Sequence, residues 1–123
     1  MAKVVAVIGA SGNRNKFGNR AVRAFMQQGY TVVPINPHET EVEGLKAYAS
    51  VLDVAGPIDM ASLYVPPDVG EQVIAEIAQK GIAEVWLNPG AESDELIARA
   101  RALRIQPIVA CSIVAIGENP YRL

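Results

Sequence analysis

Short apolar stretches rich in β-branched residues alternate with stretches of helical periodicity along this chain of 123 residues. The stretches that predict strands are Lys3–Ile8, Tyr30–Ile35, Asp59–Val65, Ala83–Leu87 and Gln106–Ala110. Those that predict helices are Phe17–Gln28, the segment between Asp68 and Gly81, and Glu92–Arg104. Such alternation is typical of βαβ units, in which right-handed crossovers place helices on both faces of a parallel sheet. We therefore predict an α/β fold: a doubly wound three-layer sandwich with a five-stranded, mostly parallel sheet.

The length of the chain predicts one domain, residues 1–123, built around a single hydrophobic core. Half of the residues are hydrophobic and a fifth are charged, a balance typical of globular proteins. The segment from Glu39 to Pro57 is the least regular, and we expect one short edge strand in it, near Ala47–Ser50. The tail that ends at Leu123 is too short to add another layer.

Composition also bears on where the chain resides. No apolar run approaches the roughly 20 residues that a membrane-spanning helix requires. The first residues lead directly into a strand, without the apolar region and cleavage site of a signal peptide. The single cysteine, Cys111, cannot form an internal disulfide, which fits a reducing compartment. We therefore expect a cytoplasmic protein with no membrane contact.

The stretch "GASGNRNKFGNR", residues 9–20, directly follows the first predicted strand. Glycine-rich turns between a strand and a helix bind phosphate through backbone N–H groups and the helix dipole. Residues 1–38 contain no acidic residue, and their basic residues are Lys3, Arg14, Lys16, Arg20 and Arg23. The whole chain has a net charge of −2, so the basic segment is local. A local basic segment on an acidic chain favours a small polyanion over nucleic acid, and we favour phosphate binding over simple solvation for Arg14 and Lys16.

The glycine spacing does not match the usual dinucleotide fingerprint, G-x-G-x-x-G followed by an acidic residue after the second strand. Two residues separate Gly9 from Gly12, and Gly18 follows six positions later. The second strand ends at Asn36, where a nicotinamide dinucleotide site has its carboxylate. NAD is therefore a less favoured ligand.

Two catalytic motifs are also excluded by spacing. A nucleophile elbow centred on Ser11 would require glycine at position 13, which is Asn13. A phosphate-binding loop of the Walker type would require serine or threonine after Lys16, but Phe17 follows it. One cysteine and one histidine give no metal-binding spacing.

Parallel α/β sheets bind ligands beyond the carboxyl ends of their strands. In this chain those ends are residues 9–16, 36–38, 64–67, 88–90 and 111–112. For Tyr64, core packing and ligand contact are equally favoured. Trp86 is expected in the core, His38 is expected in a solvated loop more often than on a ligand, and Cys111 is expected to be a small buried residue.

The segments "VVAVIGASGNRNKFGNRAVRAFMQQGYTVVPINP" and "SLYVPPDVGEQVIAEIAQKGIAEVWLNPGAE" resemble the small stand-alone CoA-binding proteins. These proteins share a Rossmann-like fold with the CoA-binding domain of the succinate–CoA ligase alpha subunit. The resemblance covers nearly the whole chain, and its most specific motifs are Gly9-Ala10-Ser11, Asn36-Pro37, Tyr64-Val65-Pro66 and Trp86–Gly90. It implies that the ligand is CoA or an acyl-CoA, held by its 3′-phospho-ADP portion.

The resemblance also implies a role for particular positions. Those expected at the pyrophosphate are Gly9, Ala10, Ser11, Asn13, Arg14 and Lys16. Those expected at the adenosine end are Asn36 and Pro37, and those lining the nucleotide cleft are Tyr64, Val65, Pro66, Asn88 and Pro89. Many stand-alone relatives have Asp-Arg-Cys at the end of the last strand, where this chain has Ala110-Cys111-Ser112, so a family role does not carry over there. The phosphorylated histidine of the ligase belongs to a second domain that has no counterpart here.

The first functional hypothesis is a non-catalytic CoA-binding carrier, sensor or regulatory protein, because no catalytic constellation is present. The alternative is an NAD(P)- or acyl-CoA-dependent enzyme subunit whose catalytic groups come from a partner. A third is a nucleotide-sensing module that contacts a larger protein. Each of these hypotheses is compatible with a homodimer or with a protein partner.

Overall fold

Five parallel strands form the central sheet of the computed structural model, which describes residues 2–123. In chain order they are β1 (Val4–Ile8), β2 (Thr31–Ile35), β5 (Met60–Leu63), β6 (Glu84–Leu87) and β7 (Gln106–Val109). Their order across the sheet is β2-β1-β5-β6-β7, and every neighbouring pair is parallel. The predicted five-stranded, doubly wound sheet is confirmed, and within this sheet the strands are parallel throughout.

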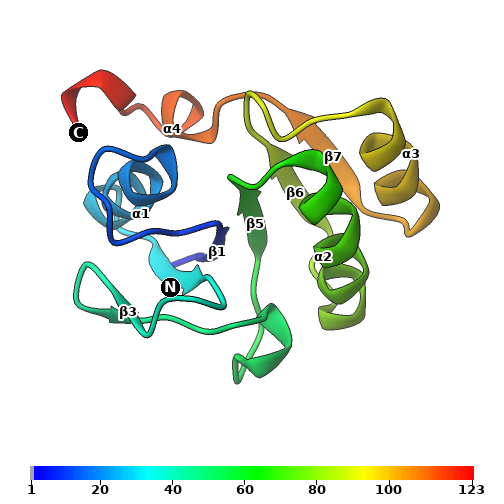
Figure 1. Ribbon diagram of the computed structural model, residues 1–123, viewed down its shortest axis with the longest axis horizontal. Helices are drawn as coiled ribbons and strands as arrows, with labels where there is room; N and C mark the ends of the chain where they lie inside the picture. Colours follow the sequence, from blue (N-terminus) through cyan, green and yellow to red (C-terminus); the bar gives the residue numbers. More distant parts are fainter. Residues whose placement is uncertain (1) are drawn as a thin grey trace.

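Helices cover both faces of the sheet, as Figure 1 shows. On one face lie α1 (Phe17–Gln27) and the short α4 (Ser112–Ala115), and on the other lie α2 (Pro67–Lys80) and α3 (Asp94–Ala102). The chain first moves outward from β1 to β2 and then crosses back to place β5 on the opposite side of β1. This reversal opens a crevice at the carboxyl ends of β1 and β5, which is where open α/β sheets bind ligands.

Two hydrophobic clusters fill the spaces between the layers. Alternate residues of β1 point to opposite faces, so Ala6 belongs to the cluster beneath α2 and α3, whereas Val5 belongs to the cluster beneath α1. Phe25 of α1 is fully buried, and the centroids of its ring and the Tyr30 ring are 4.8 Å apart in a T-shaped arrangement. Trp86, expected in the core, is only half-buried on the α1 face of β6.

The first residues of two helices differ from the expected ones. Helix α2 begins at Pro67, one residue before the predicted segment, with Pro66 as its N-cap and Asp68 in its first turn. Its carboxylate still stabilises the helix, because a negative charge in the first turn interacts favourably with the helix dipole. Helix α3 begins at Asp94, because the Ser93 hydroxyl accepts a hydrogen bond from the backbone N–H of Leu96 at 3.0 Å.

The predicted edge strand near Ala47–Ser50 is shorter than expected, because it is reduced to a single bridge at Tyr48. The chain forms a two-stranded hairpin instead, from β3 (Glu41–Val42) and β4 (Leu45–Lys46). Positive φ angles at Glu43 and Gly44 (50° and 80°) give the turn the twist that joins antiparallel strands closely. Only Tyr48 then reaches the main sheet, in a single parallel bridge to Ile35. A short 3₁₀ turn, η1 (Val51–Asp53), follows.

The C-terminal tail adds no strand, as expected, but it covers the sheet beside α1. Ile113 of α4 is fully buried in the cluster beneath α1. The last turn, η2 (Pro120–Arg122), is tied to α1 because the Arg20 guanidinium donates a hydrogen bond to the carbonyl of Pro120 at 3.2 Å. Within residues 2–123, none of the helices combines the length and apolar composition needed to cross a membrane.

Candidate functional site

A cavity of about 830 Å³ lies at the carboxyl ends of β1, β5 and β6, where the winding of the sheet reverses. Its volume falls in the upper part of the range of roughly 300–1,000 Å³ typical of small-molecule sites. The predicted site residues that line it are Gly9, Ser11, Lys16, Asn36, Tyr64, Val65, Pro66, Asn88 and Pro89. The structure therefore brings together residues from four separate loops that the sequence places far apart.

The glycine-rich loop is packed so tightly that side chains would not fit at two positions. A Cβ atom at Gly9, whose φ is +92°, would lie 2.6 Å from the carbonyl oxygen of Tyr64. A Cβ atom at Gly18 would lie 2.1 Å from the carbonyl oxygen of Gly9. These contacts hold the first turn of α1 directly against the end of β1, and glycine at both positions lets the backbone pack this closely. Such a backbone suits the close approach of a phosphate group.

Other predicted residues support the loop without lining the cavity. Ala10 is fully buried, and its carbonyl accepts a hydrogen bond from the Asn36 side-chain amide at 2.8 Å. Asn13 accepts a hydrogen bond from the backbone N–H of Asn15 at 3.0 Å and so shapes the turn. Pro37 is exposed beyond the end of β2. Ligand contact by these residues stays a prediction.

The basic segment does not converge on the cavity. The Arg14 side chain, which is 65% exposed, forms an ion pair with Glu43 in the β3–β4 turn at 3.5 Å. Arg23 donates a hydrogen bond to Asn19 at 2.7 Å, within α1. Among residues 2–123, Lys16 is the lysine or arginine that lines the cavity.

A buried network of hydrogen bonds closes the floor of the cavity. The Asn88 amide donates to Ser62 Oγ and to the carbonyl of Leu63, each at 2.9 Å. Its oxygen accepts from the backbone N–H of Ser112 at 2.8 Å. Ser112 Oγ in turn lies 2.8 Å from Ser62 Oγ and 2.7 Å from the Tyr64 hydroxyl. Asn88 and Tyr64 therefore line the cavity, but their polar atoms hold β5, β6 and α4 together.

Burial raises the pKa of the Tyr64 hydroxyl to about 12 from its usual value of 10.0. Hydrogen bonds from Ser112 and Ser62 act in the opposite direction but are weaker than the effect of burial. At neutral pH the hydroxyl is therefore protonated. It serves as a hydrogen-bonding group in the network and not as a base.

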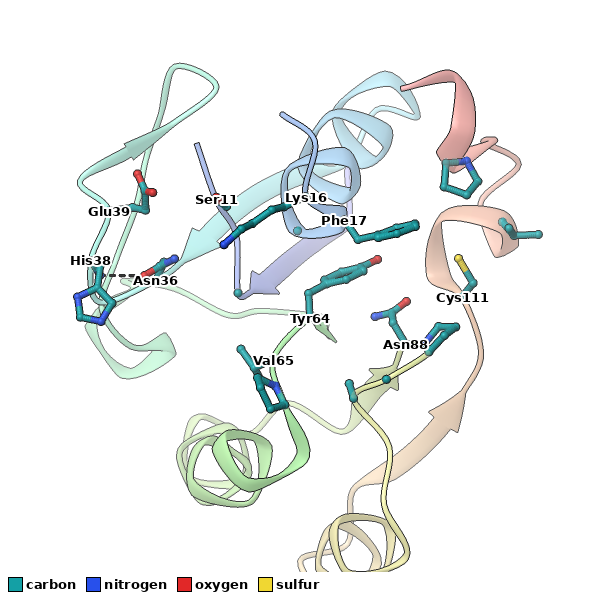
Figure 2. Close-up of a pocket in the computed structure, with 18 of the residues that line it drawn as sticks. Ser11, Lys16, Phe17, Asn36, His38, Glu39, Tyr64, Val65, Asn88 and Cys111 are labelled. Carbon is teal, nitrogen blue, oxygen red and sulfur yellow. Dashed lines mark hydrogen bonds between the residues drawn. The ribbon is translucent and has the colours of Figure 1, made fainter. Parts of the chain in front are cut away.

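Figure 2 shows that the two ends of the cavity differ in chemistry. Polar side chains gather at the end near β2, from Ser11, Lys16, Asn36, His38 and Glu39. His38 is exposed there, which agrees with the solvated loop expected for it, but it also lines the cavity. The opposite end is mostly apolar and is lined by Phe17, Cys111, Val114, Pro120 and Tyr121. Cys111, expected to be buried, is half-buried.

Glu39 and the C-terminal residues were missed by sequence reasoning. Glu39 lies four positions beyond Ile35, the last residue of β2, and its proximity to the strand-end residues was the available signal. Val114, Pro120 and Tyr121 had no such signal, because they do not follow a strand directly. Only the packing of α4 and η2 against α1 brings them to the cavity.

The geometry fits a ligand that is phosphorylated at one end and flexible and weakly polar at the other. Backbone N–H groups of the glycine-rich loop and the Lys16 ammonium group can bind the phosphates. The apolar end suits a flexible arm with few charges. CoA has both features, and the residues of the cavity fit it.

The chain belongs to the CoA-binding-domain family, because the model of that family matches residues 3–117. The chain is similar to an ADP-forming acetate–CoA ligase of Archaeoglobus fulgidus, at 43% identity over 76% of this chain and 14% of the relative. It is also similar to the alpha subunit of ADP-forming acetate–CoA ligase II of Pyrococcus furiosus, at 39% identity over 66% of this chain and 18% of the relative. The chain thus spans less than a fifth of the length of these two ligases.

Two solved structures have a fold similar to that of this chain. A conserved hypothetical protein of Pyrococcus furiosus superposes with a TM-score of 0.84 at 33% identity, over 94% of this chain and 99% of the other. A dinucleotide-forming acetyl-coenzyme A synthetase of Candidatus Korarchaeum cryptofilum, solved with phosphate and ADP, gives a TM-score of 0.78 at 30% identity. That similarity covers 88% of this chain and 25% of the synthetase. The same fold therefore occurs both as a protein of this size and as part of a much longer one.

Proposed function

We propose that this domain binds CoA or an acyl-CoA through its phospho-ADP portion, as a carrier, sensor or regulatory component that does not itself catalyse a reaction. The observation that supports this most directly is the cavity at the point where the strand order reverses. The glycine-rich loop and Lys16 lie at one end of this cavity, and apolar residues line the other. Membership of the CoA-binding-domain family supports the same ligand.

In this proposal the glycine loop and Lys16 hold the pyrophosphate, and the residues after β2 flank the adenosine. The pantetheine arm extends towards Cys111 and the C-terminal residues, where few free polar groups line the cavity. Asn88 and Tyr64 act indirectly, because their polar atoms are already used in the network with Ser112. They keep the floor of the cavity rigid, so less order has to be gained when the ligand binds.

Ligand-dependent stabilisation tests this assignment. A ligand that binds only the folded state at a hundredfold excess over its Kd adds about 2.7 kcal/mol to the free energy of unfolding. For a domain of this size, each kcal/mol raises the melting temperature by roughly 3–6 °C. We therefore expect saturating CoA to raise the melting temperature by several degrees.

NAD is the informative comparison ligand. Its nicotinamide carboxamide requires polar partners, but the amide of Asn88 and the hydroxyl of Tyr64 are engaged within the protein. NAD should therefore stabilise the domain much less than CoA. A larger shift with NAD than with CoA would reject the CoA assignment and favour a dehydrogenase-like site.

A second candidate function is that of a subunit supplying the CoA site to a larger acyl-CoA-forming enzyme. The observation that favours it is the similarity to ADP-forming acetate–CoA ligases, of which this chain matches only a small part. The purified chain should form no acetyl-CoA from acetate, ATP and CoA. A second polypeptide that copurifies from the native cells and restores this reaction would establish the subunit role.

A further inference from the structure

Glu39 places a carboxylate at the polar end of the cavity, where the sequence had offered only Asn36. It is half-buried and lines the cavity from the segment between β2 and β3. Its Oε1 atom accepts a long hydrogen bond, 3.4 Å, from the backbone N–H of Gly12 in the glycine loop. Figure 2 shows this carboxylate on the same side of the cavity as His38 and Asn36.

The contact with Gly12 places Glu39 between the two parts of the protein that flank a nucleotide in this kind of fold. The phosphates lie against the loop after β1, and the adenosine ribose lies beyond the end of β2. A carboxylate between these positions can accept hydrogen bonds from ribose hydroxyls, as the acidic residue of a dinucleotide site does. Glu39 occupies this place although it lies three positions after Asn36, the residue at which a dinucleotide site would have its carboxylate.

The charges around Glu39 determine how strongly its carboxylate repels a phosphate group on the ribose. CoA has a phosphate on the 3′ position of its ribose, whereas dephospho-CoA has a free hydroxyl there. Like charges at short range repel, most strongly where water is partly excluded. Lys16 and His38 also line this part of the cavity, but Arg14 is directed to Glu43 and does not line it. Among residues 2–123, Lys16 is the lysine or arginine that lines the cavity, and it forms no ion pair with Glu39.

We propose that Glu39 is a specificity-determining residue that accepts a hydrogen bond from a free ribose hydroxyl and disfavours a 3′-phosphate. The pocket then binds dephospho-CoA at least as tightly as CoA. The inference rests on the proposed CoA-binding function and deepens it by defining the form of nucleotide that the site prefers.

The test is calorimetric titration of CoA and of dephospho-CoA into the wild-type protein, Glu39→Gln and Glu41→Gln. Glu41 is the matched control, because it is an exposed residue of β3 opposite Lys46 and does not line the cavity. Glu39→Gln removes the charge but keeps the size of the side chain. We expect it to improve the affinity for CoA relative to dephospho-CoA by roughly five- to tenfold, whereas Glu41→Gln leaves the ratio unchanged.

Each other outcome has a definite meaning. If Glu39 only supported the glycine loop, Glu39→Gln would weaken both ligands equally, and the unchanged ratio would overturn the inference. A wild-type protein that binds CoA more tightly than dephospho-CoA would overturn it as well. Failure of both ligands to bind the folded wild-type protein would instead reject the proposed function, and the role of Glu39 with it.

Discussion

The Tyr64 hydroxyl lies 2.7 Å from Ser112 Oγ, and this hydrogen bond joins the end of β5 to the first residue of α4. Ser112 is completely buried and also bonds to Asn88, which follows β6. Three segments that are distant in the sequence therefore meet at one serine. The position of the C-terminal segment, and with it the apolar end of the cavity, depends on this junction.

Replacement of Ser112 should destabilise the protein. Ser112→Ala leaves the buried Tyr64 hydroxyl and the Asn88 oxygen with fewer partners, and each unsatisfied buried group costs about 1–3 kcal/mol. We expect urea denaturation to show a loss of this size in the free energy of unfolding. Val114→Ala is the control on the same helix, because Val114 is 59% exposed and should change stability by less than about 0.5 kcal/mol. Equal effects of the two variants would contradict the role given to the network.

The raised pKa of Tyr64 predicts a loss of stability at alkaline pH. The folded protein holds this proton with a pKa of about 12, compared with 10.0 for the unperturbed group. The contribution to stability is therefore fully present below pH 10.0 and is lost as the pH rises towards 12. The difference corresponds to at most about 3 kcal/mol.

Urea denaturation between pH 9 and pH 11.5 measures this effect. Tyr64→Phe should have a flatter dependence of unfolding free energy on pH above about 10, because the residue that titrates is gone. Tyr121→Phe is the matched control, since the Tyr121 residue is 83% exposed, and it should keep the wild-type dependence. The same slope in all three proteins would show that Tyr64 does not titrate as its burial requires.

Lys16 and Arg14 should differ in their contribution to ligand binding. Lys16 lines the cavity, whereas Arg14 is paired with Glu43 outside it. Lys16→Ala should weaken CoA binding by on the order of 1–3 kcal/mol and reduce its dependence on salt, because a charge-assisted phosphate contact is lost. Arg14→Ala should have a clearly smaller effect in the same titrations at low and high salt. If Arg14→Ala is the more damaging change, the phosphates bind outside the cavity.

Cys111 should react with CoA disulfide in the folded protein. The thiol is half-buried and lines the apolar end of the cavity, where the thiol end of a bound CoA would lie. Attack of the Cys111 thiolate on one sulfur forms a protein–CoA disulfide and releases the other CoA as a thiol. Intact mass should then increase by one CoA, and Cys111→Ser should show no increase. An adduct that forms only after unfolding in urea would show that the thiol is shielded in the native state.

The sequence by itself determined the order of the five main strands, of α1, α2 and α3, and of the glycine loop, because these depend on local periodicity and on turn-forming residues. It also determined which segments lie at the ligand-binding edge, since the carboxyl ends of parallel strands must share one edge. Ser11, Asn36 and Val65 were predicted at that edge for this reason, and all three line the cavity.

Only the tertiary structure decided which side chains at this edge face the cavity. The β3–β4 turn carries Glu43 to Arg14, and Arg14, predicted at the phosphates, does not line the cavity. The packing of α4 and η2 on α1 brings Tyr121 to the cavity, although nothing in its local sequence indicates this. The orientation of a long side chain depends on charges and surfaces contributed by distant segments, and those contacts form only once the layers have packed.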